Sequence, residues 1–174
     1  LRTYMGGELD NLVHRAGIGD ADKNRFRNAL AIFMSSFGVY RLYPEKGADL
    51  PDVSVALKGV SEEDRVLLKG ALADAGFLSR VMQFTGPLAA KGIEDTVFYD
   101  YNPLIARNEV GDAPSLAGLS AAEFHQKMIF RQDAWPHSLN AGTTHDTKRG
   151  EDSRIRLCWL SSIPEEWIAA VSTW

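Results

Sequence analysis

Apolar residues recur at a helical spacing along much of this 174-residue chain. Within residues 9–16 and again within residues 22–37 they stand three or four positions apart, which is the spacing of one face of an amphipathic helix. Two glycines, Gly17 and Gly19, follow the first of these segments and are typical of a helix end. The spacing therefore predicts two successive helices near the start of the chain.

Helix-start patterns predict further helices downstream. Ser61 is followed three positions later by Asp64, and Ser120 by Glu123, which is the spacing of a capping box. Apolar residues at helical spacing follow each pattern, so we expect helices that reach about residue 72 and about residue 132. Two more helices are expected over residues 153–160 and 164–171, the second with a proline near its first turn.

One short segment breaks the helical pattern. Residues 39–43 (Val-Tyr-Arg-Leu-Tyr) are β-branched and aromatic, and Pro44 follows them, which is typical of a short strand. A turn-rich stretch over residues 47–59 comes next. The clearest internal division is therefore expected near residues 43–60.

Composition and charge exclude several classes of protein. The formal net charge is −4 and 45% of the residues are hydrophobic, which is typical of a globular protein with a sizeable core. The acidic balance argues against a nucleic-acid partner. No apolar run approaches the roughly 20 residues that span a bilayer, so no membrane partner is expected either. A single cysteine, Cys158, excludes an internal disulfide and suits a reducing cytoplasm.

No nucleotide or metal motif stands out. Residues 86–92 resemble a phosphate-binding loop, but their lysine and glycine are in the wrong order and no Ser or Thr follows. The histidines show neither the helical pair spacing nor the partner cysteines of a zinc site. We therefore expect no cofactor and no metal.

Residues 143–154 form a charge-dense turn ahead of a helix. Such a segment is most often solvated surface, and Asp152 would favour the N-terminus of that helix. Two details favour a site instead. The turn follows Ala141 and Gly142, where a backbone can be approached closely, and His145 beside Asp146 combines a donor with a carboxylate. The residues alone leave both interpretations open.

A second dense stretch, residues 83–102, mixes aromatic rings with acids and amides. That mixture suits a sugar, which offers apolar CH faces and a rim of hydroxyls. The alternative is an amphipathic helix with Ile93, Val97, Phe98 and Tyr101 in the core. The two interpretations are evenly supported by this stretch.

Taken together, the two segments resemble one family closely, the maltooligosyl trehalose synthases of the α-amylase superfamily. The resemblance rests on the runs Ala90–Tyr99 and Thr144–Arg149, with shorter matches at residues 39–41, 85–87, 108–111, 124–125 and 135–136. Three positions depart from the family pattern: Gly38 stands where a proline is usual, Asp112 interrupts a Gly-Gly pair, and Gly150 takes the place of a frequent serine. These departures bear on loop geometry more than on the type of reaction.

The resemblance implies a mainly α chain made of a helical subdomain and a partial (β/α)₈ barrel segment. Residues 1–38 would belong to a helical subdomain inserted in the barrel, and residues 39–174 to the C-terminal part of the barrel with surrounding helices. Residues 39–43 and those around 143–145 would supply one or two short strands. A full barrel needs roughly 250 residues, so the nucleophile and the general acid would lie upstream of Leu1.

The activity implied is that of an isomerase in trehalose biosynthesis. The parent enzyme would convert the reducing-end α-1,4 linkage of a maltooligosaccharide into an α,α-1,1 linkage by intramolecular transglycosylation, and the isolated chain would be inactive. By resemblance, Asp146 is the third catalytic carboxylate. The substrate-binding residues implied are His145, Tyr40, Arg41, Lys91, Glu94, Asp95, Phe98, Tyr101, Lys148 and Arg149. For each of these the alternative is a structural ion pair or a core aromatic.

The partners implied are a maltooligosaccharide and the N-terminal barrel part of the same enzyme. Surfaces exposed without that part would favour dimerisation. Two other hypotheses stay open at this point. One is an autonomous helical carbohydrate-binding or interaction module, supported by the helical majority and the aromatic residues 98–101. The other is a part of a different amylase-like glycoside hydrolase.

Overall fold

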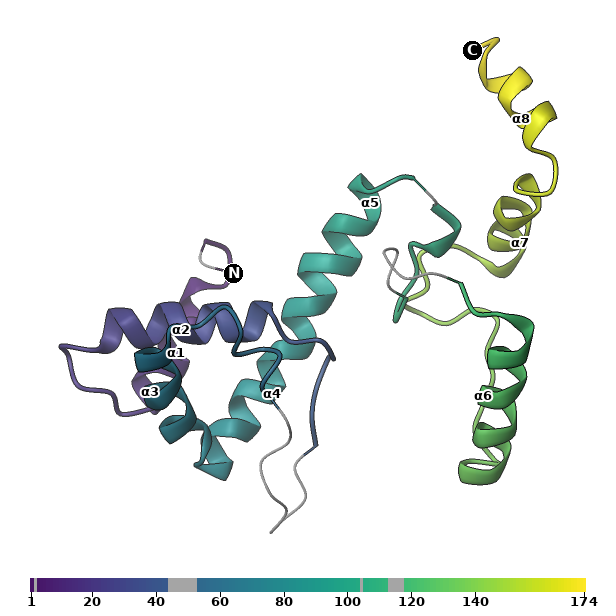
Figure 1. The fold of residues 1–174 in the computed structure, drawn as a ribbon. Helices are drawn as coiled ribbons and strands as arrows, with labels where there is room; N and C mark the ends of the chain where they lie inside the picture. The colour runs from purple at the N-terminus through teal and green to yellow at the C-terminus, as the bar shows by residue number, and fades with distance from the viewer. Residues whose placement is uncertain (2, 44–52, 104, 113–117) are drawn as a thin grey trace. The chain divides into compact units, whose positions relative to one another are not determined.

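The computed structural model of the chain describes residues 1, 3–43, 53–103, 105–112 and 118–174. These residues are mainly helical and form two units, Leu1–Thr96 and Val97–Trp174 (Figure 1). Within the described ranges, no helix is both long enough and apolar enough to cross a bilayer. The predicted helical majority is confirmed.

Four α-helices pack together among the described residues of the N-terminal unit. They are α1 (Gly6–Arg15), α2 (Lys23–Ser35), α3 (Glu62–Leu72) and α4 (Ala75–Ala89), and α2 contacts each of the other three. Gly17 follows α1 with a φ of 64°, the left-handed conformation that favours glycine at a helix end. The Ser61 hydroxyl accepts a hydrogen bond from the Asp64 N–H at 3.3 Å, which confirms the predicted start of α3.

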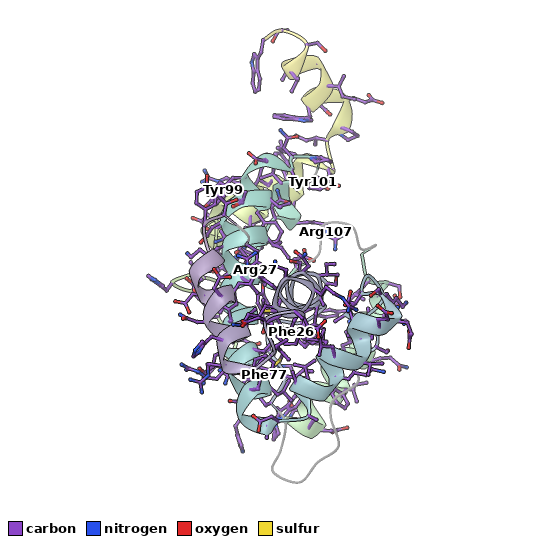
Figure 2. The ribbon with its side chains drawn as sticks, turned by 90° about the vertical axis from the view of Figure 1, so that its left-hand side faces the viewer. Phe26, Arg27, Phe77, Tyr99, Tyr101 and Arg107 are labelled. Carbon is purple, nitrogen blue, oxygen red and sulfur yellow. The ribbon has the colours of Figure 1, made fainter. Side chains whose placement is uncertain are left out.

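Apolar side chains from all four helices form the core of this unit. Leu9 of α1, Phe26 of α2, Leu68 of α3 and Val81 of α4 are each 0% exposed. The ring of Phe26 lies beside that of Phe77 on α4, with 6.2 Å between the ring centroids (Figure 2). Helices α1, α2 and α3 therefore contribute the apolar faces that their sequence spacing predicts, whereas α4 begins at Ala75, where no helix was predicted.

The predicted strand over residues 39–43 is absent, because its backbone is bonded to side chains of α4. The Tyr40 carbonyl accepts from the Thr85 hydroxyl at 2.8 Å, and the Leu42 N–H lies 3.4 Å from the Met82 sulfur. A strand needs a second extended segment to pair with. No such segment lies within the ranges that the structure covers.

Residues 143–145 are not a strand either, so the prediction of one or two barrel strands is wrong for the described part of the chain. These residues form a turn between helices instead. Pro44, which was expected to end the first strand, lies outside the described residues. The predicted division at residue 38 stays a prediction.

Helix α4 continues directly into a π-helix, η1 (Ala90–Val97), and then into α5 (Phe98–Asp100). Pro87 lies inside α4 and has no N–H to donate. Insertions of π-helix are often found at functional sites. The helical alternative for residues 83–102 is therefore correct as secondary structure. Its proposed core is not, because Phe98 is buried whereas Ile93, Val97 and Tyr101 are 42–49% exposed.

The C-terminal unit continues after α5 with η2 (Ile105–Arg107), α6 (Ala121–Ala134), α7 (Glu151–Leu160) and α8 (Pro164–Val171). The predicted capping box at the start of α6 is present. The Ser120 hydroxyl accepts from the Glu123 N–H at 3.3 Å, and the Glu123 carboxylate accepts from the Ser120 N–H at 2.8 Å. Pro164 opens α8 as predicted.

The core of the N-terminal unit is tested by two matched valine substitutions. Val81 on α4 is 0% exposed, whereas Val66 on α3 is 69% exposed. Val81→Ala is expected to lower the free energy of unfolding by about 1.5–3 kcal/mol, because it removes buried methyl groups and leaves a cavity. Val66→Ala is expected to change it by less than about 0.5 kcal/mol. Urea unfolding followed by circular dichroism measures both; equal effects would contradict this core.

Candidate functional site

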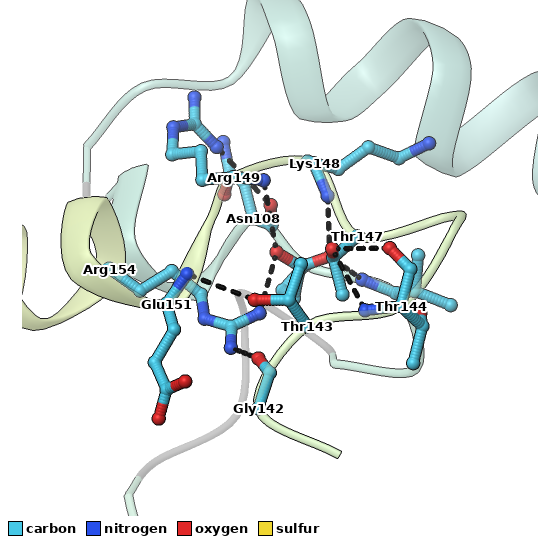
Figure 3. Close-up of polar contacts among 11 residues, drawn as sticks. Asn108, Gly142, Thr143, Thr144, Thr147, Lys148, Arg149, Glu151 and Arg154 are labelled. Carbon is cyan, nitrogen blue, oxygen red and sulfur yellow. Dashed lines mark hydrogen bonds and ion pairs between the residues drawn. The ribbon is translucent and has the colours of Figure 1, made fainter.

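The segment after Gly142 begins as a hydrogen-bonded turn with His145 and Asp146 at its centre. The Thr147 N–H donates to the Thr144 carbonyl at 3.3 Å, and the Thr147 hydroxyl donates to the same carbonyl at 2.8 Å (Figure 3). The Thr147 hydroxyl also accepts from the Thr144 N–H. His145 and Asp146 are both exposed. The turn therefore offers an imidazole and a carboxylate to solvent on adjacent residues.

The Glu109 carboxylate holds the end of this turn. Its Oε1 accepts from the Lys148 N–H at 2.8 Å and from the Val110 N–H at 2.9 Å. Its Oε2 lies 3.4 Å from the Arg149 N–H and 3.4 Å from Arg154 Nη1. The Glu109 side chain is only 16% exposed. One largely buried carboxylate therefore binds two successive N–H groups that follow the His145–Asp146 pair.

The donors around Glu109 keep it ionised. Burial by itself raises the pKa of the Glu109 carboxyl. The hydrogen bonds from Val110, Lys148, Arg149 and Arg154 act in the opposite direction, and the net result is a pKa below the ordinary value for glutamate. The group is therefore a carboxylate at neutral pH.

Arg154 and Thr143 fix the other end of the turn. Arg154 Nη2 donates to the Gly142 carbonyl, while the same guanidinium faces Glu109. The Thr143 hydroxyl accepts from the Glu151 N–H at 3.1 Å, at the first residue of α7. A Cβ at Gly142 would collide with the Glu151 carboxylate. The close approach that the sequence predicts at Gly142 is therefore confirmed.

Asn108 connects Glu109 to the end of α5. The Asn108 residue is 1% exposed, and its Nδ2 donates to the Phe98 carbonyl at 3.0 Å and to the Tyr101 carbonyl. The backbone carbonyl oxygen of Asn108 lies 3.4 Å from Arg149 Nη1 (Figure 3). In this structure Phe98 and Tyr101 thus contact the network through their backbone carbonyls.

A second pair of predicted site residues meets inside the N-terminal unit. The Tyr40 hydroxyl donates a hydrogen bond to Glu94 Oε1. Glu94 lies on the π-helix η1 and is 5% exposed, which is rare for a carboxyl group without a partner. The Tyr40 backbone is held in turn by Thr85. This contact joins the segment 39–43 to the π-helix.

The other predicted residues of this unit lie in two further pairs. Lys91 Nζ lies 2.5 Å from Asp95 Oδ2, one turn along η1. The Arg41 guanidinium lies over the ring of Tyr43, 5.0 Å from its centroid, in a cation–π contact. The Lys91–Asp95 pair is open to solvent, whereas Arg41 is half-buried and its Nε is buried without a hydrogen-bond partner among the described residues.

The predicted site residues thus fall into one group in each unit. The N-terminal unit holds Tyr40, Arg41, Lys91, Glu94 and Asp95, and the C-terminal unit holds Phe98, Tyr101, His145, Asp146, Lys148 and Arg149. Their roles in binding or catalysis stay predictions.

Sequence reasoning missed Glu109 and Arg154 as site residues. The run 108–111 is one of the short matches to the family, and Gly111, with a φ of 77°, marks the turn that follows Glu109. That signal indicates a turn but not the contacts of the carboxylate. The bonds from Glu109 cross 39 to 45 positions of sequence, and no local pattern indicates them.

The Tyr40–Glu94 contact is tested by removing one hydroxyl. Tyr40→Phe is expected to lower the free energy of unfolding by about 1–3 kcal/mol, because the buried Glu94 carboxyl loses a donor. Tyr4→Phe is the matched control, since Tyr4 is 97% exposed, and should change stability by less than about 0.5 kcal/mol. If urea unfolding of the two variants gives the same midpoint, the contact contributes nothing.

The known proteins that the chain is similar to in sequence and in structure carry closely related names. A curated Mycobacterium tuberculosis protein assigned as a maltooligosyl trehalose synthase is 36% identical over 157 residues, which are 87% of this chain and 20% of that protein. The maltooligosyltrehalose synthase of Arthrobacter ramosus shares the fold with a TM-score of 0.78 and 34% identity, over 94% of this chain and 22% of its own. A protein named DSM5389 glycosyltrehalose synthase matches with a TM-score of 0.74 and 28% identity, over 99% of this chain and 21% of its own.

No family model matches the chain. The chain spans about a fifth of the length of the curated relatives it matches. A point variant of the Arthrobacter ramosus enzyme aligns over 97% of the chain with a TM-score of 0.81 and 33% identity. By sequence and by fold, the chain matches a segment of the maltooligosyl trehalose synthases.

Proposed function

We propose that this chain is the part of a maltooligosyl trehalose synthase that supplies the third catalytic carboxylate, Asp146. The observation that supports this most is the exposed His145–Asp146 turn, anchored at both ends by Glu109 and Arg154. It occurs in a chain that aligns with such synthases over most of its length. The intact enzyme would be an isomerase that turns the reducing-end α-1,4 linkage of a maltooligosaccharide into an α,α-1,1 linkage.

The chemistry gives His145 and Asp146 definite tasks. Retaining glycosyl transfer needs a nucleophilic carboxylate and a general acid, which other parts of the enzyme would supply. The Asp146 carboxylate accepts hydrogen bonds from sugar hydroxyls, and the His145 imidazole donates one. Such contacts strengthen as the ring distorts towards the oxocarbenium-like transition state. They therefore act mainly on kcat.

The second half of the reaction transfers the sugar to its own leaving group. The general acid protonates the departing glycosidic oxygen as a glycosyl–enzyme ester forms. The released glucose then turns in the site and attacks through its anomeric hydroxyl, which gives up its proton to the same group. Water must stay out at this step, since its attack would give hydrolysis.

Exposed apolar side chains support a place within a larger protein. Residues in α6, α7 and α8 are all at least partly exposed, and Trp159, Ile168 and Trp174 are 61%, 64% and 87% exposed. An apolar groove of about 350 Å³ runs beside α7 and α8, lined in part by Leu157 and Trp167. Apolar surface of this kind marks an interface. We propose that the rest of the enzyme covers it, and that the isolated chain dimerises through it.

The role of Asp146 is tested in the intact enzyme that contains this chain. Asp146→Asn is expected to lower kcat for α,α-1,1 product roughly 100-fold or more, because the amide has lost the charge that stabilises the transition state. Asp133→Asn on the exposed face of α6 is the matched control and should leave kcat unchanged. Turnover of Asp146→Asn near that of the wild type would remove Asp146 from the mechanism.

The isolated chain separates this proposal from the autonomous-module hypothesis, which the comparisons do not favour. We expect no saturable binding when the 174-residue chain is titrated with maltopentaose by calorimetry, because the sugar would contact only part of its site. The intact enzyme, titrated in parallel, should bind. Tight and saturable binding by the isolated chain would instead indicate a self-sufficient carbohydrate-binding module.

A further inference from the structure

We propose that Glu109 is a positioning residue that sets the place of Asp146 by holding the backbone two and three residues beyond it. The proposal rests on the proposed function of Asp146 and adds a role for a side chain that need not touch the sugar. Its basis is the set of bonds from Glu109 to Lys148, Arg149 and Arg154.

The turn that carries Asp146 has little internal freedom. Three hydrogen bonds between Thr144 and Thr147 close it, and only four residues lie within it. The place of Asp146 therefore depends on how the two ends of the turn are held. The Lys148 N–H, the first donor after the turn, bonds to Glu109 at 2.8 Å, the shortest bond from the loop to this carboxylate.

Glu109 acts on both ends of the turn through Arg154. Arg154 Nη1 faces Glu109 Oε2, and its Nη2 donates to the Gly142 carbonyl, which precedes the turn. The two side chains of this ion pair are 23% and 16% exposed, so solvent screens it less than a surface pair. Without the Glu109 carboxylate, the Lys148 N–H at the end of the turn would lose its acceptor. Arg154 would also lose its ion-pair partner, so that its contact with the Gly142 carbonyl before the turn would weaken.

The backbone on both sides of Glu109 is held by hydrogen bonds. Its neighbour Asn108 is 1% exposed and is bonded to the carbonyls of Phe98 and Tyr101. Beyond Glu109, the Asp112 N–H donates to the Glu109 carbonyl at 3.0 Å. The Glu109 carboxylate is therefore held in place by its own backbone, and it thereby holds the turn in place.

Both the negative charge and the shape of the Glu109 side chain contribute to the hydrogen bonds that hold the turn. Hydrogen bonds to an ionised acceptor are roughly twice as strong as neutral ones. In Glu109→Gln the remaining oxygen can still accept from Lys148, but the new NH₂ group would face the Arg149 N–H or Arg154, which also only donate. This variant thus keeps the volume of the side chain and removes half of its contacts.

The first arm of the test measures the turn itself in the 174-residue chain by NMR. In Glu109→Gln, the Lys148 and Arg149 amides are expected to exchange roughly tenfold faster than in the wild type. Glu8→Gln, an exposed position on α1, is the matched control and should leave these amides unchanged. Unchanged exchange in Glu109→Gln would overturn the proposal.

The pH dependence shows whether the charge is responsible. Because the pKa of Glu109 is lowered by folding, its contribution is complete above the usual glutamate range and is lost as the pH falls through the lower, folded-state value. The Lys148 amide resonance should follow that acid transition in the wild type and lose it in Glu109→Gln. The other acids in the segments that form this network are Asp112, Asp146, Glu151 and Asp152. A transition that persists in Glu109→Gln belongs to one of them and contradicts the proposal.

The second arm measures catalysis in the intact enzyme. Glu109→Gln is expected to lower kcat roughly 10- to 100-fold with little change in KM, because a displaced Asp146 costs transition-state contacts more than substrate binding. Glu109→Asp, which keeps the charge, should recover part of kcat, and Glu8→Gln should match the wild type. Faster amide exchange with unchanged kcat would overturn the positioning role alone. A wild-type enzyme without α,α-1,1 product would overturn the proposed function of Asp146 as well.

Discussion

The C-terminal unit depends on a single carboxylate that meets backbone donors and a guanidinium. Glu109 binds the Lys148 N–H at 2.8 Å, and Arg154 extends the contact to the Gly142 carbonyl. Helices α6, α7 and α8 have no buried residues, so apolar burial within the unit does little to fix the loop between α6 and α7. Polar contacts, instead of apolar packing, therefore fix this loop. They hold His145 and Asp146 at an exposed turn.

The N-terminal unit is built in the opposite way. Fully buried side chains such as Phe26 and Leu68 hold its four helices together. Among its described buried polar groups is Glu94, whose contact with Tyr40 places a carboxyl of the π-helix against the segment that was expected to be a strand. The two units thus combine a conventional core with a loop network, and each contains part of the residue set proposed to meet the sugar.

Local signals predicted the helices well and the site only in part. The Ser120–Glu123 capping box and Gly17 mark real helix ends, because their physics involves only near neighbours. The segment 39–43 has the composition of a strand, yet a strand exists only with a pairing partner. The resemblance pointed to the His145–Asp146 pair. The Glu109 anchor, 39 positions away from Lys148, could not be predicted from spacing.

We propose that this chain serves an enzyme that converts the reducing end of its substrate into an α,α-1,1 linkage. The most direct measurement is the number of reducing ends over time when the intact enzyme acts on maltohexaose, with free glucose and maltose measured beside it. The account predicts that reducing ends disappear while almost no free glucose or maltose is released. An increase in reducing ends would identify a hydrolase and contradict the account.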